Sequence, residues 1–235
     1  MKKIPFFCLV FCLLLALCGC GSFGNDPTED DSSHPEPGGA ISREEFGNDP
    51  LYDYLADLAG GGLDRNSFAG LTSLSLSGFE SLTGLDALVF PALQTLEIEN
   101  CGLPELGVGE YVTLYYPALR ALKISDCGLE RLTVTASDLP RLTFLDLSDN
   151  GLTDLSGLSG LTTLVELDVS GNPNLSELPE GLRSLTSLSL LDLRGTAVSA
   201  LPDWIMELPY LSCVLAKPGQ ITRMPEGFLW LVEAE

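Results

Sequence analysis

Residues 142–152 read LTFLDLSDNGL, and this stretch decides the fold of the chain. Leu145 and Leu147 alternate with polar residues, a pattern typical of a short strand with one buried face. Leu142 and Leu152 flank that strand and predict that the chain turns and packs against the same interior. Asn150 stands where the chain must turn, and its amide can both accept from and donate to backbone groups there. One copy of this motif is too small to bury its own apolar face, so we expect neighbouring copies.

The same motif recurs in phase along the chain. With the spacing LxxLxLxxNxL, the copies begin at Leu71, Leu93, Leu119, Leu142, Leu164, Leu188 and Leu208. The differences between these numbers give spacings of 22, 26, 23, 22, 24 and 20 residues. Seven copies at nearly one period predict stacked repeats whose parallel strands lie about 4.8 Å apart. The stack would then carry a sheet about 30 Å long.

Over roughly residues 63–229 this motif resembles that of the leucine-rich-repeat family. The resemblance implies an α/β leucine-rich-repeat solenoid, a curved horseshoe with a parallel β-sheet on its concave face and short helical or 3-10 turns on its convex face. Prolines in the return segments LPEGLRSLTSL (178–188) and LPDWIMELPYL (201–211) agree, because they disfavour long helices. The family also uses small residues in place of the turn asparagine, here Cys101, Cys127 and Thr196.

The chain divides into four predicted parts. Residues 1–19 are a lipoprotein signal peptide, residues 20–48 an acidic flexible tether, and residues 49–62 an N-terminal cap helix. Residues 63–235 form the repeat domain, with about seven repeats and a C-terminal cap around Trp230. Three features predict the cap helix: Asp49 as N-cap, Pro50 in the first turn, and an apolar face formed by Leu51, Leu55 and Leu58.

The first twenty residues, MKKIPFFCLVFCLLLALCGC, have the layout of an export signal. Two lysines precede an apolar core from Ile4 to Leu17, which is short for a membrane span. Leu17-Cys18-Gly19-Cys20 resembles the bacterial lipobox, which implies that Cys20 is acylated (palmitate-type chains) and becomes the mature N-terminus, with Cys18 as runner-up. Several acyl chains give a stable membrane anchor. An ordinary signal peptide and an uncleaved membrane helix are the alternatives.

The formal net charge of −21 limits the classes of partner. Nucleic-acid binding needs clustered basic residues, and adhesion to anionic lipid headgroups needs the same, so both are disfavoured. The charge fits a basic protein or peptide partner, and it fits plain solubility equally well.

The outward positions of the concave sheet supply the candidate binding face. Stacked carboxylates repel one another, so a cation or basic group would relieve them, and exposed apolar side chains beside them suit a protein interface. The candidates are Phe144, Asp146, Glu166, Asp168, Leu190, Asp192 and Tyr210. The alternative interpretation is that LDLS is a generic form of this repeat, which would make the aspartates ordinary repeat residues.

Enzymatic function is disfavoured. The one histidine, His34, lies in the tether, so the predicted repeat domain holds no Ser-His or Cys-His pair. Phosphate-binding, dinucleotide-binding and zinc-protease motifs are absent from the sequence, and we expect no cofactor, metal or small-molecule substrate. Cys101 and Cys127 occupy equivalent positions in adjacent repeats, near enough for a disulfide. Buried free thiols are the favoured state, and the disulfide stays an open alternative.

The sequence therefore predicts a non-enzymatic binding module, lipid-anchored on the extracytoplasmic face of a bacterial cell envelope. It would engage a protein partner through the concave face of the solenoid. A carbohydrate- or cell-wall-binding envelope scaffold is the alternative, although Trp204 and Trp230 fall in a return segment and the predicted cap. A purely structural role in the envelope is the remaining possibility.

Overall fold

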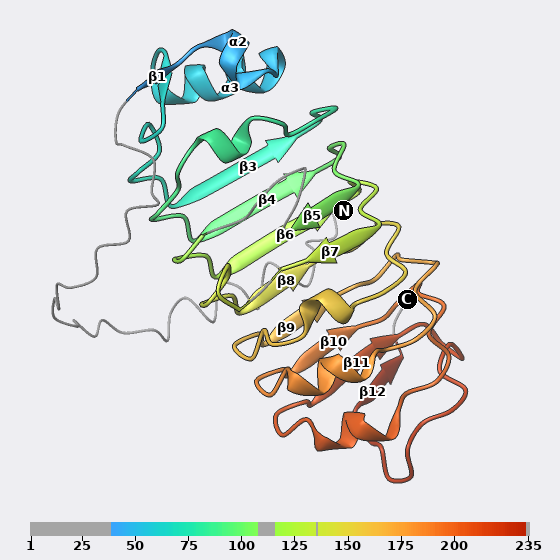
Figure 1. The fold of residues 1–235 in the computed structure, drawn as a ribbon. Coiled ribbons are helices and arrows are strands. Elements are labelled where there is room, and N and C mark those ends of the chain that lie inside the picture. Colours follow the sequence, from blue (N-terminus) through green and yellow to red (C-terminus); the bar gives the residue numbers. More distant parts are fainter. Residues whose placement is uncertain (1–38, 108–115, 135, 234–235) are drawn as a thin grey trace, which may run out of the picture. The chain divides into compact units, whose positions relative to one another are not determined.

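The computed structural model describes residues 39–107, 116–134 and 136–233. The predicted signal peptide, Cys20 and His34 lie outside these residues. Within them, eight parallel strands form one sheet in chain order, with β12 and β3 at its edges (Figure 1). The strands are β3 (Ser73–Ser77), β4 (Thr95–Glu99), β6 (Ala121–Ser125), β8 (Phe144–Asp146), β9 (Glu166–Asp168), β10 (Leu190–Asp192), β11 (Cys213–Ala216) and β12 (Leu231–Glu233).

The register of the sheet confirms the repeat motif. Leu122 pairs with Leu145, Leu145 with Leu167, and Leu167 with Leu191, so equivalent leucines stack from strand to strand. These side chains are almost fully buried in one continuous apolar core. Packing of these side chains against the neighbouring repeat is the main contribution to the stability of the fold, because no single repeat can bury them by itself.

Buried amides close the turn after the strand, as the motif predicts. The Asn150 Oδ1 accepts from the backbone N–H groups of Cys127 (3.1 Å) and Leu129 (3.0 Å), and its Nδ2 donates to the carbonyl of Ile124 (2.8 Å). Each asparagine thus joins its own repeat to the preceding one. In two earlier repeats a cysteine holds this position, and both Cys101 and Cys127 are free thiols.

The N-terminal cap begins before the predicted end of the tether at residue 48. β1 (Ala40–Ile41) pairs antiparallel with β2 (Leu63–Asp64), and α2 (Arg43–Phe46) follows, with Ser42 and Glu45 forming a capping box. Ile41 and Phe46 are buried in the core, which explains why this acidic stretch is ordered.

The helix α3 (Asp49–Ala59) lies within the predicted cap segment. Its N-cap is Asn48, whose side chain accepts from the backbone N–H of Leu51, and Asp49 lies in the first turn instead. Leu51 and Leu55 are buried as expected, but Leu58 is 49% exposed. The apolar stripe is therefore narrower than the sequence pattern predicts.

The last complete repeat has a different register from the predicted one. Leu190 pairs with Cys213 and Leu191 with Val214, so the seventh copy begins at Leu211 and not at Leu208. Leu208 and Leu211 both fit the first position of the motif. Beginning the copy at Leu211 moves every later motif position by three residues, so different side chains are buried. Gln220 takes the place of the turn asparagine, and its Nε2 donates to the carbonyl of Leu193 at 2.8 Å.

The return segments use two kinds of structure. Short 3-10 helices follow the later strands, as predicted: η2 (Ser156–Leu158), η3 (Glu180–Ser184) and η4 (Asp203–Glu207), with η1 (Leu85–Ala87) near the cap. In the two preceding repeats, β5 (Glu105–Gly107) and β7 (Arg131–Thr133) form a small parallel sheet instead, which the sequence pattern does not predict. None of the helices within the described residues is long and apolar enough to cross a membrane.

A candidate binding face and an adjoining groove

Three aspartates stack on the open face of the large sheet, the side away from the core. Asp146 pairs with Asp168, and Asp168 with Asp192, so the three form one row across β8, β9 and β10, here called the acidic row. Phe144, Glu166 and Leu190 form the adjacent row in the same register. The structure therefore brings together six of the seven residues that the sequence proposes for partner binding.

Tyr210, the seventh, is separate from this face. The residue that pairs with Leu190 is Cys213, and Tyr210 lies three residues earlier, before the buried Leu211. Its side chain is 69% exposed in the loop between η4 and β11. The expected place of Tyr210 beside Leu190 is wrong because the predicted register of the last repeat was shifted by three residues.

The acidic row has a structural role in the turns. Each aspartate accepts a hydrogen bond through Oδ1 from the backbone N–H two residues later. The pairs are Asp146 with Ser148 (2.9 Å), Asp168 with Ser170 (2.8 Å) and Asp192 with Arg194 (3.0 Å). Such a bond stabilises the local turn at the strand end. The interpretation of LDLS as a repeat consensus therefore accounts for part of this row.

The side chains of the acidic row are more buried than expected for the solvent-facing side of a sheet. Asp168 is 6% exposed and Asp192 is 1% exposed, while Phe144 and Leu190 are only half-buried. Strands about 4.8 Å apart bring neighbouring side chains into contact, so each aspartate is covered by the rows beside it.

Burial and repulsion change the protonation of the row. Burial, followed by the neighbouring negative charges of Asp192 and Asp146, raises the pKa of Asp168 from 3.8 to about 7. Burial likewise raises the pKa of Asp146, where the Lys123 charge opposes the effect, and the pKa of Glu166. Near neutral pH, the middle of the row is therefore poised between a carboxyl group and a carboxylate.

One basic residue flanks the row at each end. The Arg194 guanidinium donates to the Asp192 carboxylate, with Nη2–Oδ2 at 2.6 Å and Nε–Oδ1 at 3.0 Å. At the other end Lys123 pairs with Asp146 in register, although its ammonium lies 3.3 Å from Oε1 of Glu99. The charge of Asp192 is thus compensated within the fold. The Arg194 charge also reaches Asp168, but Asp168 forms no ion pair among the described residues.

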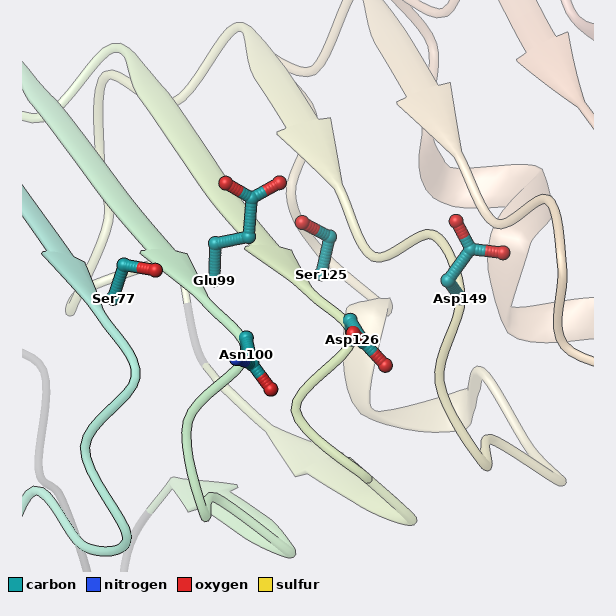
Figure 2. Close-up of a pocket in the computed structure, with 6 residues that line it drawn as sticks. All are labelled: Ser77, Glu99, Asn100, Ser125, Asp126 and Asp149. Carbon is teal, nitrogen blue, oxygen red and sulfur yellow. The ribbon is translucent and has the colours of Figure 1, made fainter.

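A shallow groove of about 570 Å³ adjoins this face at the carboxyl ends of β3, β4, β6 and β8. Figure 2 shows its six lining residues along neighbouring strand ends and the turns that follow them. They are Ser77, Glu99, Asn100, Ser125, Asp126 and Asp149. The repeat pattern by itself does not predict this groove. A signal was available, since three consecutive repeats place Asn or Asp directly before the turn residue.

These three turn residues adopt a backbone conformation that residues other than glycine rarely adopt. Asn100, Asp126 and Asp149 have φ angles of 52°, 52° and 54°. The equivalent residues of neighbouring repeats include Gly78 and Gly171, which reach positive φ without steric cost. Asn and Asp are the side chains that tolerate this region best, so the fold accepts polar side chains at the groove.

Metal binding finds no support among the described residues, where no group of three His, Cys, Asp or Glu side chains could hold a metal ion. The carboxylates of the groove and of the acidic row lie along different strands and do not converge on one point. An extended ligand with several donors suits such spacing better than a single ion does.

Comparison with known sequences supports the repeat assignment. The family described as Leucine Rich repeats (2 copies) matches residues 140–184. Probable disease resistance protein At1g61190 of Arabidopsis thaliana is 43% identical over 77 residues, which are 32% of this chain and 8% of that protein. Disease resistance protein RFL1 of the same plant is 48% identical over 48 residues, 20% of this chain and 5% of that protein. The chain thus spans less than a tenth of the length of these relatives.

Solved structures share the architecture. An internalin, InlF, of Listeria monocytogenes has a TM-score of 0.54 at 17% identity, covering 83% of this chain and 59% of that chain. The Toll–Spatzle complex of Drosophila contains a chain with a TM-score of 0.53 at 23% identity, covering 69% of this chain and 23% of that one. At these identities the similarity concerns the fold alone. The matched repeats, these similar folds and the in-register parallel sheet together identify the fold as a leucine-rich-repeat solenoid.

Proposed function

We propose that this chain is a non-enzymatic binding module that engages a protein partner through the open face around the acidic row. The observation that carries the proposal is Asp168, a buried carboxyl group with a raised pKa and no ion pair within the described part of the chain, in the row beside the half-buried Phe144 and Leu190. A basic group from a partner would stabilise the charged form of Asp168, while Phe144 and Leu190 would contribute apolar contact.

Charge supports a basic partner. The formal net charge of −21 creates a negative field that accelerates the approach of a positively charged protein. One of the similar folds, Toll, was solved in a complex with the protein Spatzle, which agrees with a protein ligand for this kind of solenoid.

Substitution of the open face tests the proposal. Partners would be identified by proximity labelling of the native protein and then measured individually for affinity. Phe144→Ala combined with Leu190→Ala should weaken the affinity of a genuine partner at least tenfold. Tyr210→Ala is the matched control, because Tyr210 is an exposed aromatic residue away from this face. Equal affinity of the double variant and the control would refute the proposed face.

The location is a separate part of the proposal. Acylation of Cys20 would anchor the solenoid on the extracytoplasmic face of a bacterial envelope, and its support is the lipobox-like Leu17–Cys20 stretch. Cys20→Ser should abolish incorporation of labelled palmitate and release the protein from membranes, whereas Cys18→Ser should leave both unchanged. Continued labelling of the Cys20→Ser variant would contradict the anchor.

Carbohydrate or cell-wall binding has less support. Trp204 lies in η4 and Trp230 directly before β12, and both are half-buried. The Trp230 ring packs against Phe228 with a centroid distance of 5.2 Å, so it serves the end of the core. A glycan array would test this alternative. Saturable glycan binding that is the same in the native protein and in the Phe144→Ala, Leu190→Ala variant would favour it.

A further inference from the structure

The groove beside the open face contains a hydroxyl group that the fold leaves without a partner. Ser125 is 5% exposed, and its Oγ forms no hydrogen bond with any residue that the structure describes. A buried polar atom without a partner destabilises the folded state, and native proteins rarely keep one without an ordered water, an ion or a ligand to satisfy it. Because Ser125 lines the groove, a ligand entering there can supply the missing bond.

The groove is rich in acceptors and poor in cations. Glu99, Asp126 and Asp149 bring carboxylates to it, and Asn100 adds an amide. Lys123 forms an ion pair with Glu99 at 3.3 Å. Asp126 and Asp149 form no ion pair with any Lys or Arg of the described chain. The surplus of acceptors indicates a ligand that is positively charged and carries several hydrogen-bond donors.

The arrangement of these acceptors favours one kind of cation. Glu99 and Ser125 pair in register on β4 and β6, and Figure 2 shows the carboxylate and the hydroxyl on the same side of their strands. Neighbouring strands lie about 4.8 Å apart, and the planar fork of a guanidinium can donate to groups on two such strands and keep further N–H groups for the nearby carboxylates, whereas an ammonium has fewer donors and no fixed fork. A metal ion is disfavoured, since the described carboxylates form no metal-binding group.

We propose that this groove binds an arginine side chain of the protein partner, with the guanidinium bridging the Glu99 carboxylate and Ser125 Oγ. Asp126 and Asp149 add the negative field that holds the cation. The inference rests on the proposed function in that it assumes a protein partner, but the groove is distinct from the acidic row. It therefore defines a second contact, at the strand ends.

A short peptide tests the site on the full chain. Acetyl-Gly-Arg-Gly-amide would be titrated while amide NMR shifts are followed, and saturable shifts should centre on residues 99–100, 125–126 and 149. The same peptide with citrulline in place of arginine keeps the shape without the charge, and it should bind at least tenfold more weakly. Equal binding of the two peptides would contradict the proposal.

Ser125→Ala separates binding from folding. The variant removes an unpartnered hydroxyl, so its melting temperature should equal or exceed that of the native protein, while its affinity for the arginine peptide should fall about fivefold. Ser73→Ala, an exposed serine of β3 outside the groove, should change neither. Unchanged affinity in Ser125→Ala would overturn the assignment.

The two proposals fail in different ways. If the peptide binds normally but the Phe144 and Leu190 variant keeps full partner affinity, the open-face proposal is wrong and the groove remains. If partner affinity depends on Phe144 and Leu190 but the arginine peptide gives no saturable shifts, the groove assignment is wrong and the open face remains.

Discussion

The raised pKa of a single carboxyl group shows how packing alters the chemistry of one residue. Asp168 follows the repeat pattern like Asp146 and Asp192, and it forms the same turn hydrogen bond. It differs in position, because it has an acidic neighbour on both sides in the row and no basic one. Its raised pKa arises from that environment, so the residue type alone does not distinguish it from the other two.

The protonation of Asp168 should appear in the pH dependence of stability. Its pKa is about 7 in the folded state against 3.8 ordinarily, so between about pH 4 and 7 the folded protein binds more protons than the unfolded chain. Stability from this group is then present at acid pH and is lost as the pH rises through 7. Asp168→Asn keeps an acceptor for Ser170 and should gain about 2–4 kcal/mol relative to the native chain at pH 8, but little at pH 4.

Urea unfolding at both pH values measures this difference. Glu226→Gln, at an exposed position, is the control and should change stability equally little at pH 4 and pH 8. The same effect of Asp168→Asn at both pH values would show that Asp168 does not titrate in this range.

At the scale of elements, the sequence predicts the strands well and the register of the last one poorly. Each LxL pair from Leu74 to Leu193 is buried as the alternation indicates. The motif places the last copy wrongly because Leu208 and Leu211 both satisfy it and no asparagine marks the turn that follows. Gln220 performs that role from a longer loop, which a fixed spacing misses.

The candidate site was predicted in part for a similar reason. Alternation places Asp146, Asp168 and Asp192 on one face, and the structure confirms that face. Their burial, the bond from Arg194 to Asp192 and the missing partner of Ser125 depend on side-chain packing between strands. A repeat pattern contains no information about such distances.

The corrected register gives a test at the level of one strand. Val214 is fully buried and Cys213 is half-buried on the open face, whereas the motif beginning at Leu208 assigns the opposite. Val214→Ala should destabilise the protein by about 2 kcal/mol through the cavity it leaves. Cys213→Ala should change the free energy of unfolding by less than about 0.5 kcal/mol. Denaturant unfolding that reverses this order would support the register that begins at Leu208.

At the scale of the whole molecule, the surplus of negative charge opposes folding. The formal net charge is −21, and the described ion pairs are mostly exposed, so they compensate little of the repulsion. Raising NaCl from about 0.02 M to 0.5 M shortens the range of electrostatic repulsion below the dimensions of the solenoid.

Salt should therefore stabilise this protein. We expect the melting temperature to rise by several degrees across that range, because screening removes more repulsion than attraction. Thermal unfolding followed by circular dichroism would measure it, with sucrose as the uncharged control for solute effects. A fall in the melting temperature with NaCl would mean that attractive pairs dominate.

The left-handed turns also determine how this surface could evolve. A side chain introduced at Gly78, before the groove, would meet no atom within 4 Å. At Gly171, beyond it, an added Cβ would lie 2.1 Å from Oδ1 of Asp149 and 3.0 Å from its backbone nitrogen. A mutation to Asn or Asp could thus add a recognition position towards β3, whereas one towards β9 would require the Asp149 side chain to move. The groove can therefore be lengthened more readily towards β3 than towards β9.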